Sequence, residues 1–452
     1  MLRAIKLGIF MLGMGMLPSA EAADGSAATP VTPALSPAAQ AMKQRMGADE
    51  WGKLAERLAK VNSDIATRGI RSFPGTTDKL LTGYPYNEYY DWDLYFENVY
   101  LTYYGIPDYC FTNLKQFLNR ETPDGYVNRS LIKERDRQHF KPFLAQLAVM
   151  GTKMKGDSYE WARAEYYDKL KKYLDRWFAY DGDHNGLPVW NSADHSGMDN
   201  QWSRVGALAS FEVEGVDLAC YLVRELQAMA IIADKLGKRD DQKLFQAHAI
   251  QLGKLINDTF WDETGGFYYD RNEKKNERVR VKSVAGFMPL WAGVATPERA
   301  QRLVREHLLN EKEFWTPYPV ASYAKTEPDY YQGVVARECN WRGSTWAPAN
   351  YMIFHGLMNY GFQAEARELA NRLFRMALDV NPATREFYNA ETGAGLGQTQ
   401  FWGFSALYYV MPLECQLNYN PADLNKDIQP IVPRHLGVPF TPDVPAASPA
   451  KN

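Results

Sequence analysis

Apolar residues recur at three- and four-residue spacing through most of this chain, and this periodicity constrains the fold more than any other feature. Over residues 216–236 the apolar positions fall on one face of a helix, and Gly237 ends the pattern. A second helical pattern covers residues 244–260 and is preceded by Asp240 and Asp241, which can cap a helix. The two segments predict an αα-hairpin.

The same pattern repeats and predicts about twelve helices in hairpin pairs. We expect them at residues 40–68, 88–104, 108–120, 140–152, 157–179, 205–236, 240–260, 283–293, 296–309, 346–360, 362–379 and 399–413. Strand signals are few, the clearest being a hairpin at residues 261–270, where Gly265 and Gly266 suit a tight turn. Units of the βαβ type are missing, so a parallel sheet is not expected.

Paired helices can form either an open solenoid or a closed double ring. We favour the closed ring of six inner and six outer helices, the (α/α)6 barrel, which makes the predicted fold class all-α. The reason is that the loops between helix pairs are long, aromatic and rich in carboxylates. Loops of that kind would line one mouth of a barrel.

The two ends of the chain differ from its helical body. Residues 1–22 combine a positive start at Arg3 and Lys6, an apolar run and an Ala-Glu-Ala site, and this order predicts a cleaved signal peptide. Residues 23–39 predict a flexible linker, and residues 439–452, rich in Pro and Ala, a disordered tail. The folded domain is then residues 40–438, and the expected location is periplasmic or secreted.

Charge and cysteine usage limit the partners of the chain. The 51 Lys and Arg nearly balance the 54 Asp and Glu, which argues against a nucleic-acid partner. No later stretch approaches 18 uninterrupted apolar residues, so we expect no membrane insertion. Four cysteines, Cys110, Cys220, Cys339 and Cys415, form no C-x-x-C pair, and either disulfides or free thiols are compatible with their spacing. The sequence does not specify an oligomeric state.

Three polar-aromatic loops interrupt the helical pattern, at residues 86–93, 190–200 and 387–393. Each places a carboxylate beside Trp or Tyr, as carbohydrate sites do, because aromatic faces contact the C–H side of a sugar while carboxylates bind its hydroxyls. A glycosidase needs one carboxylic acid to protonate the leaving oxygen and one carboxylate to activate water or attack carbon. Most loop carboxylates are helix caps or solvated charges. Asp199 and Glu391 are the strongest candidates, because both lie in aromatic loops that contain glycine.

Three ordered motifs resemble those of glycoside hydrolase family 63 and its trehalase-like relatives, in particular the small mannosylglycerate hydrolase type. They are residues 196–200 (SGMDN), 341–351 (WRGSTWAPANY) and 388–393 (YNAETG). The resemblance covers roughly residues 85–450. It implies an (α/α)6 barrel that hydrolyses α-glycosides with inversion, with Asp199 as general acid and Glu391 as general base.

The resemblance also implies a set of substrate-binding residues. Residues 90–93 (YDWD) resemble the family's W-x-W-D stretch, with Tyr90 in place of the first Trp. The expected substrate contacts are Tyr90, Trp92, Asp93, Trp341, Arg342, Trp346 and Tyr388. For Asp93 a helix cap remains the alternative, and for Trp346 a core position. The chain departs from the family at residues 141–143, where Lys-Pro-Phe replaces Gln-Pro-Pro, which bears on sugar specificity more than on reaction type.

One loop resembles the opening of a calcium-binding loop. Asp181, Asp183 and Asn185, followed by a glycine, repeat the D-x-D-x-N-G pattern, although the closing glutamate is missing. A distant acidic residue, Glu212 or Glu214, is a candidate to complete such a site, and a plain turn is the alternative. The cofactor that this loop could hold is a structural Ca²⁺. The chemistry itself is expected to require no cofactor.

These observations predict an exported inverting exo-α-glycosidase, first of all an α-glucosidase that hydrolyses a disaccharide or another short α-glucoside. Trehalase and glucosyl- or mannosylglycerate hydrolase are alternatives within the same class. A polysaccharide lyase on the same toroid would need a basic groove, which the net charge of −3 disfavours. A non-catalytic sugar-binding protein is the third alternative.

Overall fold

The computed structural model describes residues 43–431, except for 136–137, 202–203, 205–211, 335–338, 422–423, 425–426 and 429–430. The predicted signal peptide (1–22), linker (23–39) and tail (439–452) lie outside the described residues and stay predictions. Within the described part of the chain, none of the helices combines the length and the apolar character that crossing a bilayer requires.

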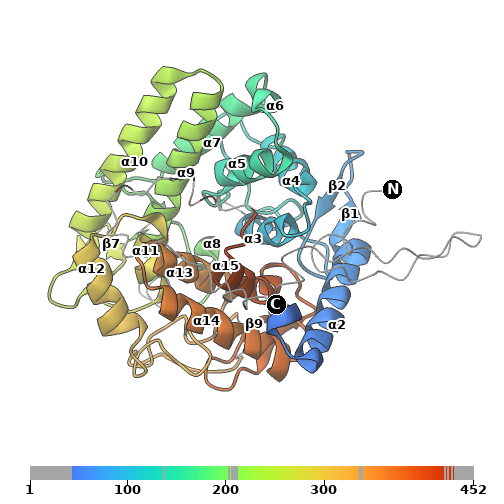
Figure 1. The fold of residues 1–452 in the computed structure, drawn as a ribbon. Coiled ribbons are helices and arrows are strands. Elements are labelled where there is room, and N and C mark those ends of the chain that lie inside the picture. The colour runs from blue at the N-terminus through green and yellow to red at the C-terminus, as the bar shows by residue number, and fades with distance from the viewer. Residues whose placement is uncertain are drawn as a thin grey trace, which may run out of the picture.

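Six helical segments of the described residues form an inner ring (Figure 1). Each contacts the next along the chain, and the last contacts the first, so the ring closes. The segments are α3 (Asp91–Thr102), α5 (Leu144–Lys155), α9 (Val216–Lys235), α11 (Met288–Ala292), α13 (Ala347–Asn359) and the 3₁₀ helix η7 (Phe404–Tyr409). Every residue of α3 is buried, as expected for a helix enclosed on all sides.

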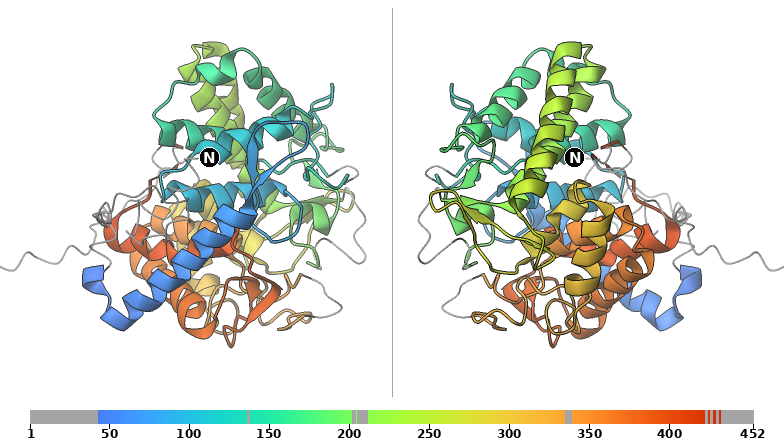
Figure 2. Two further views of the ribbon diagram at one scale, coloured as in Figure 1. Left: turned by 90° about the vertical axis from the view of Figure 1, so that its right-hand side faces the viewer. Right: turned by 90° about the vertical axis from the view of Figure 1, so that its left-hand side faces the viewer.

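Outer helices alternate with these inner helices along the chain. They are α2 (Ala48–Asp64), α4 (Asp108–Leu118), α7 (Tyr166–Phe178), α10 (Arg239–Thr259), α12 (Pro297–Arg302) and α14 (Gln363–Arg375). They are amphipathic: in α7 the buried residues, such as Leu170, Tyr173, Leu174 and Trp177, recur at helical spacing. Figure 2 shows the long pair α9 and α10 side by side. The alternation gives two concentric rings, so the predicted all-α (α/α)6 barrel is confirmed.

Shorter elements extend or connect these helices. The remaining helical segments are α6 (Glu160–Arg163), α8 (Ala193–Ser196), α15 (Met411–Leu417), η2 (Ile65–Gly69), η4 (Val284–Phe287), η5 (Leu303–Leu308) and η6 (Met376–Val380). The strands are β1 (Ile70–Ser72), β2 (Lys79–Leu81), β3 (Val189–Trp190), β4 (Val213–Glu214), β5 (Trp261–Asp262), β6 (Phe267–Tyr268), β7 (Arg271–Asn272), β8 (Glu277–Arg278), β9 (Arg385–Tyr388) and β10 (Gly395–Thr399). β3, β4, β7 and β8 form one antiparallel sheet in that order, and the other strands pair as hairpins.

The predicted hairpin at residues 261–270 is confirmed, with Trp261 opposite Tyr268. The hairpin β9–β10 was not predicted, and it displaces two expected elements. The third polar-aromatic loop, expected from residue 387, begins inside strand β9. The helix expected at 399–413 starts only at Phe404, because Thr399 is paired with Arg385 in the hairpin.

Candidate active site

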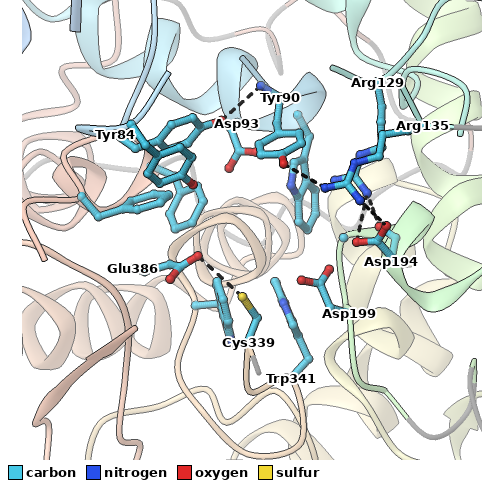
Figure 3. A pocket seen from close by; sticks show the side chains of 16 residues that line it. Tyr84, Tyr90, Asp93, Arg129, Arg135, Asp194, Asp199, Cys339, Trp341 and Glu386 are labelled. Atoms are coloured by element: carbon cyan, nitrogen blue, oxygen red, sulfur yellow. Dashed lines mark hydrogen bonds and ion pairs between the residues drawn. The ribbon is translucent and has the colours of Figure 1, made fainter. Parts of the chain in front are cut away.

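A cavity of about 190 Å³ lies at the end of the barrel where α3, α13 and η7 begin (Figure 3). Its volume suits a single sugar ring rather than a long polymer segment. Of the residues predicted for the site, the wall contains Tyr90, Trp92, Asp93, Asp199, Trp341 and Trp346. It also contains residues that were not predicted, namely Tyr84, Tyr86, Arg129, Arg135, Asp194, Gly197, Cys339, Glu386, Phe401 and Phe404.

Asp199 is brought to the wall by a short helix and a tight turn. The hydroxyl of Ser192 accepts a hydrogen bond from the His195 N–H at 3.0 Å and so caps the start of α8. Gly197 then ends α8 with a φ of +80°, and a Cβ at this position would stand 2.8 Å from the Trp92 ring. Only glycine fits this turn without strain, and Asp199 follows two residues later.

The surroundings of Asp199 favour its protonated form. Burial raises the pKa of Asp199 to about 7, and the negative charge of Asp194 acts in the same direction. The cations of Arg129 and Lys141 oppose this shift. A carboxyl group with a pKa near neutrality is suited to donate a proton to a leaving group.

The second acidic group of the cavity belongs to Glu386 on strand β9. Its Oε2 accepts a hydrogen bond from the Gln398 N–H on β10 at 3.0 Å, and its Oε1 accepts one from the Cys339 thiol at 3.7 Å. Burial raises the pKa of Glu386, and these two hydrogen bonds oppose the shift by stabilising the ionised form. Figure 3 shows Glu386 and Asp199 on either side of the Cys339 sulfur.

Glu391, the predicted general base, is not part of this cavity wall. It lies in the turn between β9 and β10, where its Oε1 accepts a hydrogen bond from the Tyr330 hydroxyl at 2.9 Å and pairs with Lys325 at 3.0 Å. About a third of its side chain is exposed to solvent. The structure thus brings Asp199 together with Glu386 in the cavity wall, and the role of Glu391 as general base stays a prediction.

Two other expected substrate contacts also lie outside the cavity wall. The Arg342 guanidinium lies 4.8 Å from the centre of the Tyr331 ring. Tyr388 is fully buried beneath the hairpin, where its hydroxyl accepts a hydrogen bond from the Arg385 N–H at 3.0 Å. Glu386, which lies two residues before Tyr388 on β9, is the residue of this strand that belongs to the cavity wall.

An aromatic stack connects the elements that carry the two acids. The Trp341 ring lies 4.2 Å from Trp346, and Trp346 lies 4.5 Å from Phe387, which directly follows Glu386. At the other end Trp341 contacts Trp92 at 5.9 Å. Rings packed face to face are stiff and hydrophobic, so the stack fixes β9 relative to the start of α3.

Basic residues gather on the Asp199 side of the cavity. The guanidinium groups of Arg129 and Arg135 lie 5.4 and 5.9 Å from the Tyr90 ring centre, and both approach the carboxylate of Asp194, at 3.8 and 3.6 Å. The Nε of Arg129 has no hydrogen-bond partner among the described residues. Behind them, Lys141 and Asp91 form a completely buried ion pair at 2.9 Å. Three cations thus face two carboxylates at this end of the cavity.

Asp93 projects into the cavity from the first turn of α3. Burial raises the pKa of Asp93 to about 7, and Asp91 acts in the same direction. One turn further, Glu97 is buried against Gly83 and Gly403, and burial raises its pKa well above the usual value. Asp93, the acidic residue of α3 in the cavity wall, can therefore bind sugar hydroxyls either as a carboxylate that accepts a hydrogen bond or as a carboxylic acid that donates one.

The loop at residues 181–186 folds as a compact acidic turn. The carboxylates of Asp181, Asp183 and Glu273 have oxygens within 4.8 Å of one another, a spacing that suits a hard cation. Asn185, the third ligand predicted from the sequence, accepts the Leu187 N–H at its Oδ1 at 2.8 Å and donates from its Nδ2 to Glu214 at 2.7 Å, and its role as a ligand stays a prediction. Neither glutamate considered from the sequence completes the cluster. Glu214 pairs with Arg271 at 2.6 Å, and Glu212 pairs with Lys274 at 2.8 Å.

The residues that the sequence did not indicate share one property. Arg129, Arg135, Cys339 and Glu386 lie next to a recognised motif or in a connecting loop rather than within a motif. For Glu386 the only signal was the aromatic pair Phe387 and Tyr388 followed by turn residues, Asn389 and Gly393, which is typical of a strand that enters a hairpin turn. For the two arginines and Cys339 no local pattern distinguishes them from surface residues.

Comparison with known proteins places this site in a family context. A family model described as the mannosylglycerate hydrolase MGH1-like glycoside hydrolase domain matches residues 84–402. This range contains every residue of the cavity wall except Phe404. The match confirms the family resemblance that the three motifs indicated.

Individual relatives agree with this match. A mannosylglycerate hydrolase of Thermus thermophilus is 30% identical over 187 residues, which are 41% of this chain and 41% of that protein. A cytosolic neutral trehalase of Kluyveromyces lactis is 34% identical over 158 residues, which are 34% of this chain and 20% of the trehalase. The aligned segments thus span less than half of each of these relatives.

The solved structures extend the similarity over most of the chain. A family 63 mannosylglycerate hydrolase of Thermus thermophilus, crystallised with glucose, superposes with a TM-score of 0.60 at 22% identity. The superposition covers 77% of this chain and 98% of that enzyme. At this identity the likeness establishes a common fold.

Proposed function

We propose a reaction for this chain from the premise that it belongs to the mannosylglycerate hydrolase MGH1-like glycoside hydrolase family. The proposed reaction is the hydrolysis of a small α-glycoside from its non-reducing end, with inversion at the anomeric carbon. Asp199 acts as general acid and Glu386 as general base. The observation that carries this assignment is that these two carboxyl groups face one sugar-sized cavity, separated by the Cys339 sulfur.

In the proposed mechanism, the sugar ring lies on Trp92 and Trp341, and Asp93 binds its hydroxyls. Protonated Asp199 donates its proton to the glycosidic oxygen as the bond to the anomeric carbon breaks. Ionised Glu386 takes a proton from a water molecule, which attacks that carbon from the opposite face. An inverting site needs about 6.5–9.5 Å between the carboxyl groups to hold this water, whereas a retaining site needs about 5–5.5 Å. A sulfur atom between the two acids supports the wider spacing.

The choice between Glu386 and Glu391 has a direct test. We expect Glu386→Gln to lower kcat by about 10²–10⁴-fold, because the amide cannot take a proton from water. Glu391→Gln is the matched control: it makes the same change five residues away, and we expect less than about a threefold effect on kcat. A large loss in Glu391→Gln with little loss in Glu386→Gln would restore the assignment made from the sequence alone.

For the substrate, an α-glucoside with a small neutral aglycone is the first candidate, on the strength of the family resemblance and the small cavity. A glycoside of a hydroxy acid is the second, because the leaving group must lie beside Asp199, where Arg129 and Arg135 lie. The mannosylglycerate hydrolases among the relatives carry such a substrate in their name. An acidic aglycone would pair with the partly exposed guanidinium of Arg135.

A substrate panel tests the proposal as a whole. It should contain aryl α- and β-glucosides and mannosides, trehalose, and glucosyl- and mannosylglycerate, with NMR of the first anomer released. We expect turnover of α-glycosides only and a β-anomer as first product. A first product with the α-configuration would exclude inversion, and turnover of none of these compounds would leave the sugar-binding alternative.

We also propose that the acidic turn holds a structural Ca²⁺ through Asp181, Asp183 and Glu273. The support is the close approach of three carboxylates, whose oxygens lie within 4.8 Å of one another, a spacing that suits a hard cation. We expect a chelator to lower the melting temperature, calcium to restore it, and Glu273→Gln to remove the response. The same melting temperature with chelator and with calcium would argue for a plain turn.

We propose export to the periplasm or the medium from residues 1–22, which have the order of charged, apolar and small residues of a signal peptide. Cell fractionation of the full chain, compared with a chain starting at residue 23, tests this. Both forms in the cytoplasm would contradict export.

A further inference from the structure

The thiol of Cys339 lies between the two acidic groups of the cavity. Its Sγ is 3.7 Å from Glu386 Oε1, and the Asp199 carboxyl group lies close enough to act on the thiol electrostatically. Figure 3 shows the sulfur between the two side chains, within the cavity wall. The other three cysteines are buried in the protein core, so Cys339 is placed differently from the rest.

The backbone around Cys339 is held by neighbours on both sides of the cavity. The Asn340 side chain donates to the carbonyls of Tyr331 and Gly333 at 3.0 and 3.1 Å. The Trp341 N–H donates to the Asn200 side chain at 2.8 Å, and Asn200 directly follows Asp199. The position of the sulfur is thus coupled to the loop that carries the acid.

We propose that Cys339 is a positioning residue for the hydrolysis, whose thiol donates a hydrogen bond to Glu386 and holds this carboxylate apart from Asp199. This inference rests on the proposed function. A thiol has one proton, and the ionised carboxylate is the stronger acceptor. Burial and the two carboxylates raise the pKa of Cys339 far above its usual value, so the thiol keeps its proton and adds no negative charge.

The groups around Glu386 show how the thiol affects the ionisation and the orientation of this carboxylate. The Gln398 N–H holds one carboxylate oxygen and Cys339 the other. Asp199, Asp93 and Tyr86 lie within electrostatic range of Glu386. Without the thiol, Oε1 would lose its donor while the neighbouring acids remain, so the carboxylate would become easier to protonate and free to turn.

The test compares Cys339→Ala and Cys339→Ser with the wild type on an aryl α-glycoside that the wild type hydrolyses. We expect Cys339→Ala to lower kcat about tenfold with KM changed less than about twofold, as for one lost hydrogen bond in the reacting state. The acid limb of the kcat/KM profile should move to higher pH, because loss of this hydrogen bond raises the pKa of Glu386. Cys339→Ser, which keeps a donor, should have its acid limb at or below the wild-type pH.

Cys415→Ala is the matched control, because the Cys415 thiol contacts a backbone carbonyl, that of Pro412, at the same 3.7 Å but within the core. We expect it to lower the melting temperature without moving the pH profile. An unchanged kcat and acid limb in Cys339→Ala would overturn the inference, and so would a Cys339→Ser limb at higher pH if the alanine variant does not fold. A wild type inactive on every glycoside of the panel would instead overturn the proposed function, on which this inference depends.

Discussion

The charged residues around Asp199 shift its pKa in opposite directions. Burial and Asp194 raise the pKa of Asp199, whereas Arg129 and Lys141 lower it, and the result is about 7. An acid catalyst works only while protonated, so kcat/KM should fall as the pH rises through this value. The alkaline limb of the pH profile therefore reports on this balance of charges.

Asp194→Asn tests this balance. The substitution removes the negative charge that raises the pKa of Asp199 and leaves the cations of Arg129 and Arg135 unopposed, so the pKa should fall. We expect the alkaline limb of kcat/KM to move to lower pH. Asp124→Asn, which removes an exposed partner of Arg176 at 3.5 Å, is the control and should leave the limb in place. If the alkaline limb of kcat/KM does not move in Asp194→Asn, the charge of Asp194 does not contribute to the raised pKa of Asp199.

Single residues also mark the limit of sequence reasoning. The location of Asp199 in a sugar-sized cavity was predicted, because its motif is a short continuous stretch of sequence that lies together at the cavity wall. For the companion acid the sequence indicated Glu391, whereas the cavity wall contains Glu386, five positions earlier on the strand that leads into the same turn. Only the pairing of β9 with β10 decides which of them faces the cavity, and the second strand, GLGQT, carries almost no strand signal.

At the scale of elements, the short helix α8 and the turn after it position the acid. Gly197 combines a φ of +80° with a gap of 2.8 Å between a potential Cβ and the Trp92 ring. A side chain here would be strained by its backbone conformation and would also push against a ring of the sugar-binding wall.

Gly197→Ala should therefore reduce both stability and activity. We expect the free energy of unfolding to fall by more than about 1–2 kcal/mol, the cost of the left-handed conformation alone. We expect kcat to fall by about 10²-fold, because Asp199 is displaced. Gly105→Ala is the control: its φ is +67° with no atom within 4 Å of a Cβ, so only the conformational cost applies. Equal activity in the two variants would mean that the turn does not position the acid.

Helices were predicted better than the elements between them. The pair at 216–260 was predicted from its periodicity and the glycine between its members, and the structure adds that the inner helix is buried on all sides and the outer one on a single stripe. The ends of helices and the short strands depend on contacts far away in sequence. The bridge between Thr345 and Tyr388, for example, joins two loops that no local pattern relates.

At the scale of the whole molecule, the barrel is closed at the end opposite the cavity by a buried polar cluster. Glu414 on α15 pairs with His355 on α13 at 2.9 Å and accepts hydrogen bonds from Tyr351 at 3.1 Å and from Tyr103. Tyr103 directly follows α3, the first helix of the inner ring. This cluster ties the last helix of the described chain to the first helix of the ring.

Removing the Glu414 carboxylate, the centre of this cluster, should weaken the contact between α15 and the end of α3. We expect Glu414→Ala to lower the free energy of unfolding by about 1–3 kcal/mol, because the buried Tyr351 and Tyr103 hydroxyls lose a hydrogen-bond acceptor. Urea unfolding measures the change. Glu368→Ala, which removes an exposed partner of Arg372 on α14, should cost less than about 1 kcal/mol. Similar values for the two variants would show that the cluster does not close the barrel.

Because η7 contacts α3, the first and last inner helices are neighbours although about three hundred residues of chain separate them. A ribosome makes α3 about three hundred residues before η7, so the ring stays open until η7 has been made. Glu386 and Phe404 join the cavity only at that stage. The site cannot form on a chain that stops before η7, and a nascent chain should not act on sugars until η7 has left the ribosome.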